Sequence, residues 1–307
     1  MRRYRFYQLD VFTTRPFGGN PLAVFVDAQG LTDNEMQSIA REMNLSETTF
    51  ILPPTDPKAD VRVRIFTPAY EMPLAGHPVV GTHWLLAELG RYTLKSPSTR
   101  VMGQLGAGTL PVDISVEDGR VTRVTMTQAK PVFRASIMPS HLPALAEALG
   151  LVTDELRVGN LLPQTVSTGV PQLMVPVKSL DAVGRIQVGA RRLAEIAHEA
   201  HAQLVYPFTF QTISTAAQVH ARAYPIGMDV PEDAATGSAA GSLGAYLVRH
   251  RAIPLGNPTG FVIEQGLEMH RQSAITVEVD GTPDDIQAVR VGGTAVTVIE
   301  GELRLPG

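Results

Sequence analysis

Apolar and polar positions in the first third of the chain alternate in the manner of β-strands, interrupted by one stretch with helical spacing. Residues 4–12 and 22–27 have strand-like patterns, and the Gly- and Pro-rich segment 16–21 between them predicts a turn. Further strands are predicted at residues 48–52 and 61–65, the latter half-exposed because apolar residues alternate there with arginines.

A helix is predicted between the second and third of these strands. Thr32 and Glu35 have the spacing of a capping box, and apolar residues follow at helical intervals. Asn44 tolerates the left-handed conformation that ends many helices. Glu47 is therefore expected at the exit of this helix, directly before a strand.

Two later segments, residues 79–89 and 236–249, are apolar nearly all round and predict fully buried helices. A glycine, Gly76 or Gly237, stands at the start of each, and each follows a strand and an acidic residue. We interpret the similarity as a diverged internal duplication, with chance similarity as the alternative. The predicted fold is α+β, with two pseudo-symmetric lobes, each a curved and mostly antiparallel sheet wrapped around a central helix.

The second half of the chain has further strand-like and helical segments. Strands are predicted at residues 120–127, 172–177, 219–224, 261–265, 275–279, 289–291 and 295–304, and surface helices at 142–149 and 191–203. A boundary near Asp118 and Gly119 divides the chain into a first lobe, residues 1–120, and a second lobe, residues 121–307. The last strand is a candidate to return to the first lobe.

Length and composition exclude several classes of protein. At 307 residues two domains are expected, and the net charge of -4 offers no basic surface for nucleic acid. The absence of cysteine excludes disulfides and thiolate chemistry. No apolar stretch is long enough to cross a membrane, and the first residues lack the apolar core of a signal peptide. We therefore expect a cytoplasmic protein that binds neither nucleic acid nor membranes.

Three side chains are candidates for proton transfer. Glu47 has apolar neighbours in the sequence, and desolvation would raise its pKa toward neutrality, as general acid/base catalysis requires. His77 is expected at a helix N-terminus, which favours the neutral imidazole. Asp233 could orient or share a proton with His77 across a cleft. Taken singly, Glu47 could be a surface glutamate, His77 a helix cap, and Asp233 a carboxylate stabilised by a helix dipole.

The backbone N–H groups at the starts of the two predicted buried helices are candidates for binding an anion. Gly76, Gly237 and Ser238 stand where helix N-termini present free N–H groups, and glycine permits close approach, so a substrate carboxylate could bind there. Facing each other, the two half-sites would enclose one small acid. Neither a Walker phosphate loop, a dinucleotide fingerprint nor a cluster with metal-ligand spacing is present, so we expect no cofactor and no metal.

With these residues in view, the chain resembles the phenazine-biosynthesis PhzF-like isomerase family, which has the diaminopimelate epimerase-like fold. The motifs that carry the resemblance follow one another along nearly the whole chain: Asp10-Val-Phe-Thr13, Pro16-Phe-Gly-Gly-Asn20-Pro-Leu-Ala-Val-Phe25, Met43-Asn-Leu-Ser-Glu47-Thr-Thr-Phe50, Glu71-Met-Pro-Leu-Ala-Gly76-His77-Pro78, Ser167-Thr-Gly169-Val-Pro171 and Glu232-Asp233-Ala-Ala-Thr236-Gly237-Ser238.

The resemblance implies a cofactor-free proton shuttle in a cleft between two lobes. The glutamate matching Glu47 takes a proton from one carbon and returns it to another, while the residues matching His77 and Asp233 assist. The turn matching Gly237 and Ser238 helps to bind the substrate carboxylate, and we place Asn20 of the first motif and Gly76 among the substrate-binding residues. The related epimerases use two cysteines, which this chain lacks. A homodimer is expected.

One departure from the family pattern concerns substrate identity. The family's Gly-Arg-Pro-Ser stretch is replaced here by residues 270–273, His-Arg-Gln-Ser, and the family often has Pro where Ala234 stands. We therefore expect a cofactor-independent isomerase that moves a proton within a small carboxylate-bearing substrate. Its alternatives are an amino-acid racemase or epimerase with bases on opposite faces, and a non-catalytic protein that binds small acids.

Overall fold

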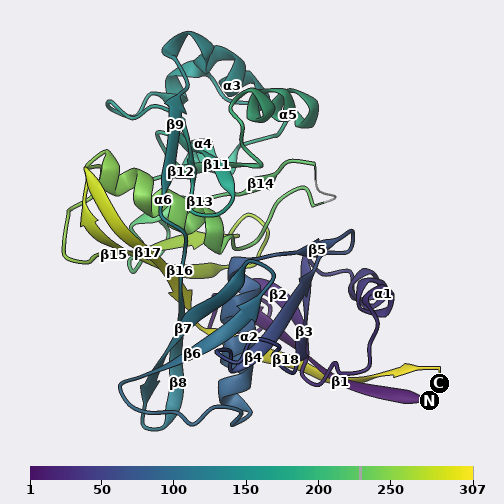
Figure 1. The fold of residues 1–307 in the computed structure, drawn as a ribbon. Coiled ribbons are helices and arrows are strands. Elements are labelled where there is room, and N and C mark those ends of the chain that lie inside the picture. The colour runs from purple at the N-terminus through teal and green to yellow at the C-terminus, as the bar shows by residue number, and fades with distance from the viewer. Residues whose placement is uncertain (228–229, 307) are drawn as a thin grey trace. The chain divides into compact units, whose positions relative to one another are not determined.

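The chain folds as two units, each built from strands around a buried helix. In this computed structural model residues 1–227 and 230–306 are described. Unit 1 contains residues 1–127 together with 292–307, and unit 2 contains residues 128–291. Both ends of the chain therefore belong to unit 1, where the first and last strands lie side by side (Figure 1).

Unit 1 is dominated by strands. Its strands are β1 (Arg2–Val11), β2 (Asn20–Phe25), β3 (Glu47–Leu52), β4 (Val61–Phe66), β5 (Glu71–Met72), β6 (Ser98–Leu105), β7 (Gly108–Glu117), β8 (Arg120–Thr127) and β18 (Ala295–Leu305). Its helices are α1 (Asp33–Met43) and α2 (Gly76–Glu88). Strand β1 pairs antiparallel with both β2 and β18, so the last strand completes the sheet begun by the first.

Helix α1 has the ends that its sequence predicts. The Thr32 hydroxyl accepts from the Glu35 N–H, and the Glu35 carboxylate accepts from the Thr32 N–H, which completes the capping box. Asn44 ends the helix in the left-handed conformation, with φ of 52°. This turn leads the chain directly into β3, whose first residue is Glu47.

Helix α2 is the buried centre of unit 1 and contacts strands β1, β2, β3, β7, β8 and β18. The helix begins at Gly76, at the glycine expected to stand at its start and three residues before the apolar segment 79–89. Pro78 is compatible with this position because the N–H groups of the first helical turn have no partner within the helix. Gly81 permits the close packing, since a Cβ there would lie 2.6 Å from Val11 Cγ2.

Unit 2 has more helices. Its strands are β9 (Val132–Ser136), β10 (Gln164–Ser167), β11 (Pro171–Pro176), β12 (Leu204–Thr209), β13 (Val219–Ala221), β14 (Tyr224–Pro225), β15 (Thr259–Gln265), β16 (Ser273–Thr282) and β17 (Asp285–Gly293), the last of which ends in unit 1. Its α-helices are α3 (Leu142–Ala148), α4 (Leu180–Gly184), α5 (Ala190–Glu199) and α6 (Gly237–Arg249). Helix α6 is buried and contacts β10, β11 and β16.

The strand connections repeat in the two units. In unit 1 the pairs β1–β2, β2–β3, β3–β4, β4–β6 and β6–β7 are in turn antiparallel, parallel, antiparallel, parallel and antiparallel. In unit 2 the pairs β10–β11, β11–β12, β12–β13, β13–β15 and β15–β16 follow the same sequence. The second parallel connection contains the buried helix in each unit, α2 or α6. The predicted α+β fold with two pseudo-symmetric lobes is confirmed.

Several predicted elements differ in extent from those observed. The strand predicted at residues 219–224 is divided into β13 and β14, and the helix predicted at 191–203 ends at Glu199. Strands β6, β7, β9, β10 and β12 were not predicted. In the described residues, every helix is too short or too polar to span a membrane.

Candidate functional site

Glu47 is buried at the start of β3 and keeps only 9% of its surface exposed. The left-handed turn at Asn44 reverses the chain between α1 and β3. In the parallel ladder with β2, Glu47 is the register partner of Leu22. The burial excludes the alternative that Glu47 is a surface glutamate at a helix end.

His77 is the second residue of α2 and its side chain faces Glu47. The imidazole Nε2 lies 3.2 Å from Glu47 Oε2, and His77 is only 4% exposed. The two atoms are close enough for an ion pair but too poorly aligned for a hydrogen bond, so His77 Nε2 has no hydrogen bond in the described residues. Such loose geometry is common for catalytic groups before substrate binds.

The other nitrogen of His77 contacts Asn20, at the start of β2. Asn20 Nδ2 lies 3.3 Å from His77 Nδ1, and Asn20 is 1% exposed. The Ser46 hydroxyl donates to Asn20 Oδ1 at 3.0 Å. Strand β2, the turn before β3 and the first turn of α2 thus bring Asn20, Ser46, Glu47 and His77 together.

His77 is neutral at physiological pH. Burial lowers its pKa to about 3. The N-terminus of α2 acts in the same direction, because the positive end of a helix dipole disfavours an imidazolium. A neutral imidazole has one N–H donor and one acceptor nitrogen, so His77 can donate to one neighbour and accept from another.

Asp233 belongs to unit 2, where a polar network precedes α6. The Thr236 hydroxyl donates to Asp233 Oδ2 at 2.6 Å, and Gln265 Nε2 donates to the Asp233 carbonyl at 2.7 Å. Gln265 Oε1 in turn accepts from the Thr236 N–H and from the Tyr206 hydroxyl. Asp233 is therefore held from its side chain and its backbone, while the adjacent Glu232 forms a separate ion pair with Arg222.

Gly237 and Ser238 open α6, and their surroundings are also polar. Thr236, the residue before the helix, makes no side-chain cap because its hydroxyl is directed to Asp233. Gln172 Nε2 donates to Ser238 Oγ at 2.8 Å. Helix α2 likewise begins without a side-chain cap, after Ala75. Uncapped N–H groups at a helix start can bind an anion.

The predicted residues therefore form one group in each unit. Asn20, Glu47, Gly76 and His77 lie in unit 1, and Asp233, Gly237 and Ser238 lie in unit 2. The residues that sequence reasoning missed are the polar supports Ser46, Gln172, Thr236 and Gln265. Ser46 and Thr236 lie inside motifs of the family resemblance and Gln172 directly follows one, whereas Gln265 lies outside them. Nothing in their residue types distinguishes these four from other polar residues.

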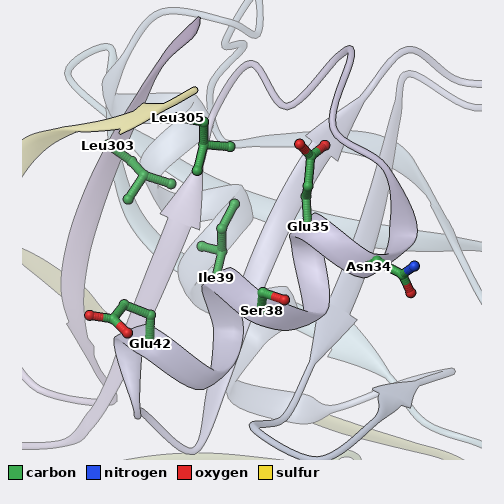
Figure 2. A pocket seen from close by; sticks show the side chains of 7 residues that line it. All are labelled: Asn34, Glu35, Ser38, Ile39, Glu42, Leu303 and Leu305. Carbon is green, nitrogen blue, oxygen red and sulfur yellow. The ribbon is translucent and has the colours of Figure 1, made fainter. Parts of the chain in front are cut away.

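A pocket on unit 1 has none of these residues in its lining. It is formed by α1 and the end of β18, and its lining residues are Asn34, Glu35, Ser38, Ile39, Glu42, Leu303 and Leu305 (Figure 2). Glu35, one of the acids in this lining, is already bound to Arg2 and, in the capping box, to Thr32. In the described residues no three His, Asp or Glu side chains are placed to hold a metal ion.

Comparison with known proteins agrees with the fold and with these motifs. Residues 9–301 match the family described as phenazine biosynthesis-like protein. An uncharacterized isomerase of Clostridium acetobutylicum is 36% identical over 306 residues, covering 99% of each chain. The trans-2,3-dihydro-3-hydroxyanthranilate isomerase of Pseudomonas aeruginosa is 35% identical over 305 residues, covering 98% of this chain and all of that one.

Solved structures give the same result. A PhzF-family protein of Bacillus anthracis superposes with a TM-score of 0.88 at 32% identity, covering 99% of this chain and all of the other. A hydroxyproline epimerase of Agrobacterium vitis shares the fold alone, with a TM-score of 0.67 at 16% identity over 98% of this chain and 92% of that one. The chain is therefore a member of the phenazine biosynthesis-like PhzF family and an isomerase.

Proposed function

We propose that this isomerase moves a proton between two carbons of a small carboxylate-bearing substrate, with Glu47 as general acid/base. The observation that carries the proposal is the buried pair of Glu47 Oε2 and His77 Nε2, 3.2 Å apart. A buried carboxylate beside a neutral imidazole can accept a proton and return it within a site from which water is largely excluded.

The three candidate catalytic residues have different proposed roles. Glu47 takes the proton from one carbon and delivers it to the other, so that no proton need be lost to water. His77, neutral because of its burial, lies with Nε2 3.2 Å from Glu47 Oε2, and we propose that it donates its N–H to the carboxylate once bound substrate tightens this contact. Asp233 is proposed to assist proton transfer, and the bonds from Thr236 and Gln265 support this role by fixing its position.

Carboxylate recognition is proposed for the starts of the two buried helices. Gly237 and Ser238 at α6, and Gly76 at α2, offer N–H groups at uncapped helix N-termini. Asn20 was expected to bind substrate as well, and that role remains a prediction. The relative in Pseudomonas aeruginosa is named for an anthranilate, a compound class that carries a carboxylate. A test panel therefore starts from trans-2,3-dihydro-3-hydroxyanthranilate and adds other small unsaturated and amino acids.

Glu47→Gln tests the proposal because it keeps the shape of the side chain and removes the proton carrier. On the first panel compound that the wild type isomerises, kcat is expected to fall by about 10²-fold or more. Glu42→Gln, in the exposed last turn of α1, is the matched control and should retain wild-type turnover. A Glu47→Gln enzyme with near-wild-type turnover would contradict the assignment.

The reaction is proposed to need neither metal nor organic cofactor. The helix-end N–H groups and a conjugated or enol-forming substrate would stabilise the developing negative charge. Activity is expected to survive dialysis against EDTA. Activity that returns only when a metal is added would contradict this part of the proposal.

Assembly and location complete the proposal. We propose a homodimer in the cytoplasm that binds neither nucleic acid nor membranes. Sedimentation equilibrium of the purified chain, whose monomer mass is 33.1 kDa, tests the assembly directly. A species of one chain mass at micromolar concentration would contradict the dimer.

A further inference from the structure

We infer that Asn20 is a positioning residue that sets the tautomer of His77, so that the ring proton is on Nε2 and faces Glu47. The effect of Asn20 on catalysis rests on the proposed function, in which Glu47 is the general acid/base. The tautomer itself follows from contacts within unit 1 and can be measured without a substrate.

The first step is the orientation of the Asn20 amide. Ser46 Oγ lies 3.0 Å from Asn20 Oδ1, and its hydroxyl donates to that oxygen. The amide nitrogen Nδ2 then faces His77 Nδ1 at 3.3 Å. Because an amide nitrogen is only a donor, Nδ1 must be the acceptor and the ring hydrogen must be on Nε2.

The second step concerns the opposite orientation of the amide, which would place Oδ1 against His77. Nδ1 would then have to carry the hydrogen, and Nε2 would present a lone pair to Glu47 Oε2 at 3.2 Å. A lone pair against an ionised carboxylate is repulsive in a buried site, where charges are weakly screened. With Nε2–H the same contact is attractive, so an ionised Glu47 selects the orientation that donates from Asn20.

The third step is a parallel in unit 2. Gln172, near the start of β11, donates through its amide nitrogen to Ser238 Oγ. Ser238 is the second residue of α6, as His77 is the second residue of α2. Asn20 is on β2 and Gln172 is on β11, and these strands are the first members of the parallel pairs β2–β3 and β11–β12. In each unit, therefore, a buried amide on the corresponding strand donates to the second residue of the buried helix. Because His77 Nδ1 and Ser238 Oγ accept from the amide, the ring hydrogen of His77 and the hydroxyl hydrogen of Ser238 point away from it.

The consequence is a defined resting state for the base. With the hydrogen on Nε2, the 3.2 Å contact favours the ionised, proton-accepting form of the Glu47 carboxylate. The reversed tautomer would instead favour a protonated Glu47, which donates to Nε2 and cannot accept a proton. Asn20 thus acts through His77 on the protonation state in which Glu47 meets the substrate.

Nuclear magnetic resonance of the histidine ring nitrogens tests the inference on the intact protein. Two-bond ¹⁵N–¹H correlation spectra near pH 7 distinguish Nε2–H from Nδ1–H, and the signals of His77 are assigned by their loss in His77→Gln. The wild type is expected to show the Nε2–H tautomer. An Nδ1–H ring, or a doubly protonated one, would overturn the inference, and this result does not depend on the folding of any Asn20 variant.

Asn20→Asp is the informative variant, since a carboxylate can only accept and should move the ring hydrogen to Nδ1. Its kcat is expected to fall about 10-fold or more with a smaller change in KM. Asn34→Asp on exposed α1 makes the same chemical change as a control and should leave the His77 signals unchanged. If a folded Asn20→Asp keeps the Nε2–H signal, Asn20 does not set the tautomer. If the wild-type tautomer is as stated but Glu47→Gln remains active, the proposed function fails and the inference about Asn20 stands.

Discussion

At the residue scale, the chemistry depends on burying two groups that normally face water. Glu47 and His77 both belong to the buried polar residues of unit 1. A buried ionisable group shifts the free energy of folding with pH, because the folded and unfolded chains bind protons differently. The same burial that favours a neutral imidazole should therefore reduce stability in acid.

The pH dependence of stability is the first prediction. In the unfolded chain both His77 and His83 have a pKa near 6.5, whereas burial lowers the values to about 3 and about 4 in the folded protein. As the pH falls below 6.5 the unfolded chain gains protons that the folded protein does not bind. The free energy of unfolding should then fall by up to about 1.4 kcal/mol per pH unit for each group, and by less for His83 as the pH approaches its folded pKa of about 4.

Urea unfolding between pH 7 and pH 4.5 measures this effect. His83 is completely buried, and its Nδ1 lies 2.8 Å from the Tyr92 hydroxyl. His83→Gln removes one of the two titrations, so its stability should decline less steeply with acidification than that of the wild type. If the stability of both proteins declines equally, His83 binds as many protons in the folded state as in the unfolded state, and the prediction is wrong.

Sequence reasoning at this scale identified residue types but not partners. Glu47 stood out as an acid among apolar neighbours, and His77 as a polar residue before an apolar helix. The contact of Asn20 with His77 joins positions 57 residues apart, and that of Gln172 with Ser238 joins positions 66 apart. Only the folded chain shows such contacts, because no local pattern records which strand will lie beside which helix end. The roles of these residues remain predictions.

At the element scale, the buried helices α2 and α6 require small residues where strands approach. A Cβ on Gly81 would lie 2.6 Å from Val11 Cγ2 and 2.7 Å from Leu22 Cδ2. Gly81→Ala should therefore destabilise the protein by about 1–3 kcal/mol through overpacking, more than the roughly 1 kcal/mol that alanine contributes to helix propensity.

Thermal or urea unfolding of Gly81→Ala checks this prediction against a matched control. Gly184 ends α4, is exposed, and has no atom within 4 Å of the position of an added Cβ. Gly184→Ala should leave stability unchanged or raise it slightly. Equal effects of the two substitutions would mean that close packing around α2 is not the reason for glycine at position 81.

Local signals predicted the elements unevenly. The capping box and Asn44 located both ends of α1, because those interactions are made within the segment itself. The apolar segment that predicted α2 begins only at residue 79, whereas the helix begins at Gly76 after Ala75, which makes no side-chain cap that would mark the start. Strand β6 was missed because Gly103 interrupts its pattern. Strand β7 was missed although Val112, Ile114 and Val116 alternate with polar residues, and the two strands pair with each other.

At the scale of the whole molecule, unit 1 is assembled from both ends of the chain. Strand β18 pairs with β1 from Arg2 to Val11. A fragment of residues 1–127 should therefore lack native structure, because β1 would keep β2 but lose β18, and its free edge would be exposed. Joining residues 292–307 to that fragment by a flexible linker should restore dispersed amide signals. A well-folded fragment 1–127 would contradict this account of unit 1.

The same strand order occurs in both units, as expected for a duplication that the sequence motifs predict. The two motifs at Gly76 and Gly237 suggested a duplication, and the identical succession of parallel and antiparallel pairs in each unit supports it. The family and the fold class could be predicted from the chain alone because several motifs occur in one order. The substrate could not, because a small acid is selected by side chains whose positions no motif specifies.

The most direct test of the central claim follows the transferred hydrogen. A panel compound that the enzyme isomerises is prepared with deuterium on the carbon that loses its proton, and the product of a single turnover in ordinary water is examined by mass spectrometry and NMR. If Glu47 takes and returns the proton, part of the product should carry deuterium at the receiving carbon. A product with only solvent hydrogen at that carbon would contradict a single shuttling glutamate and would favour two bases that exchange with water.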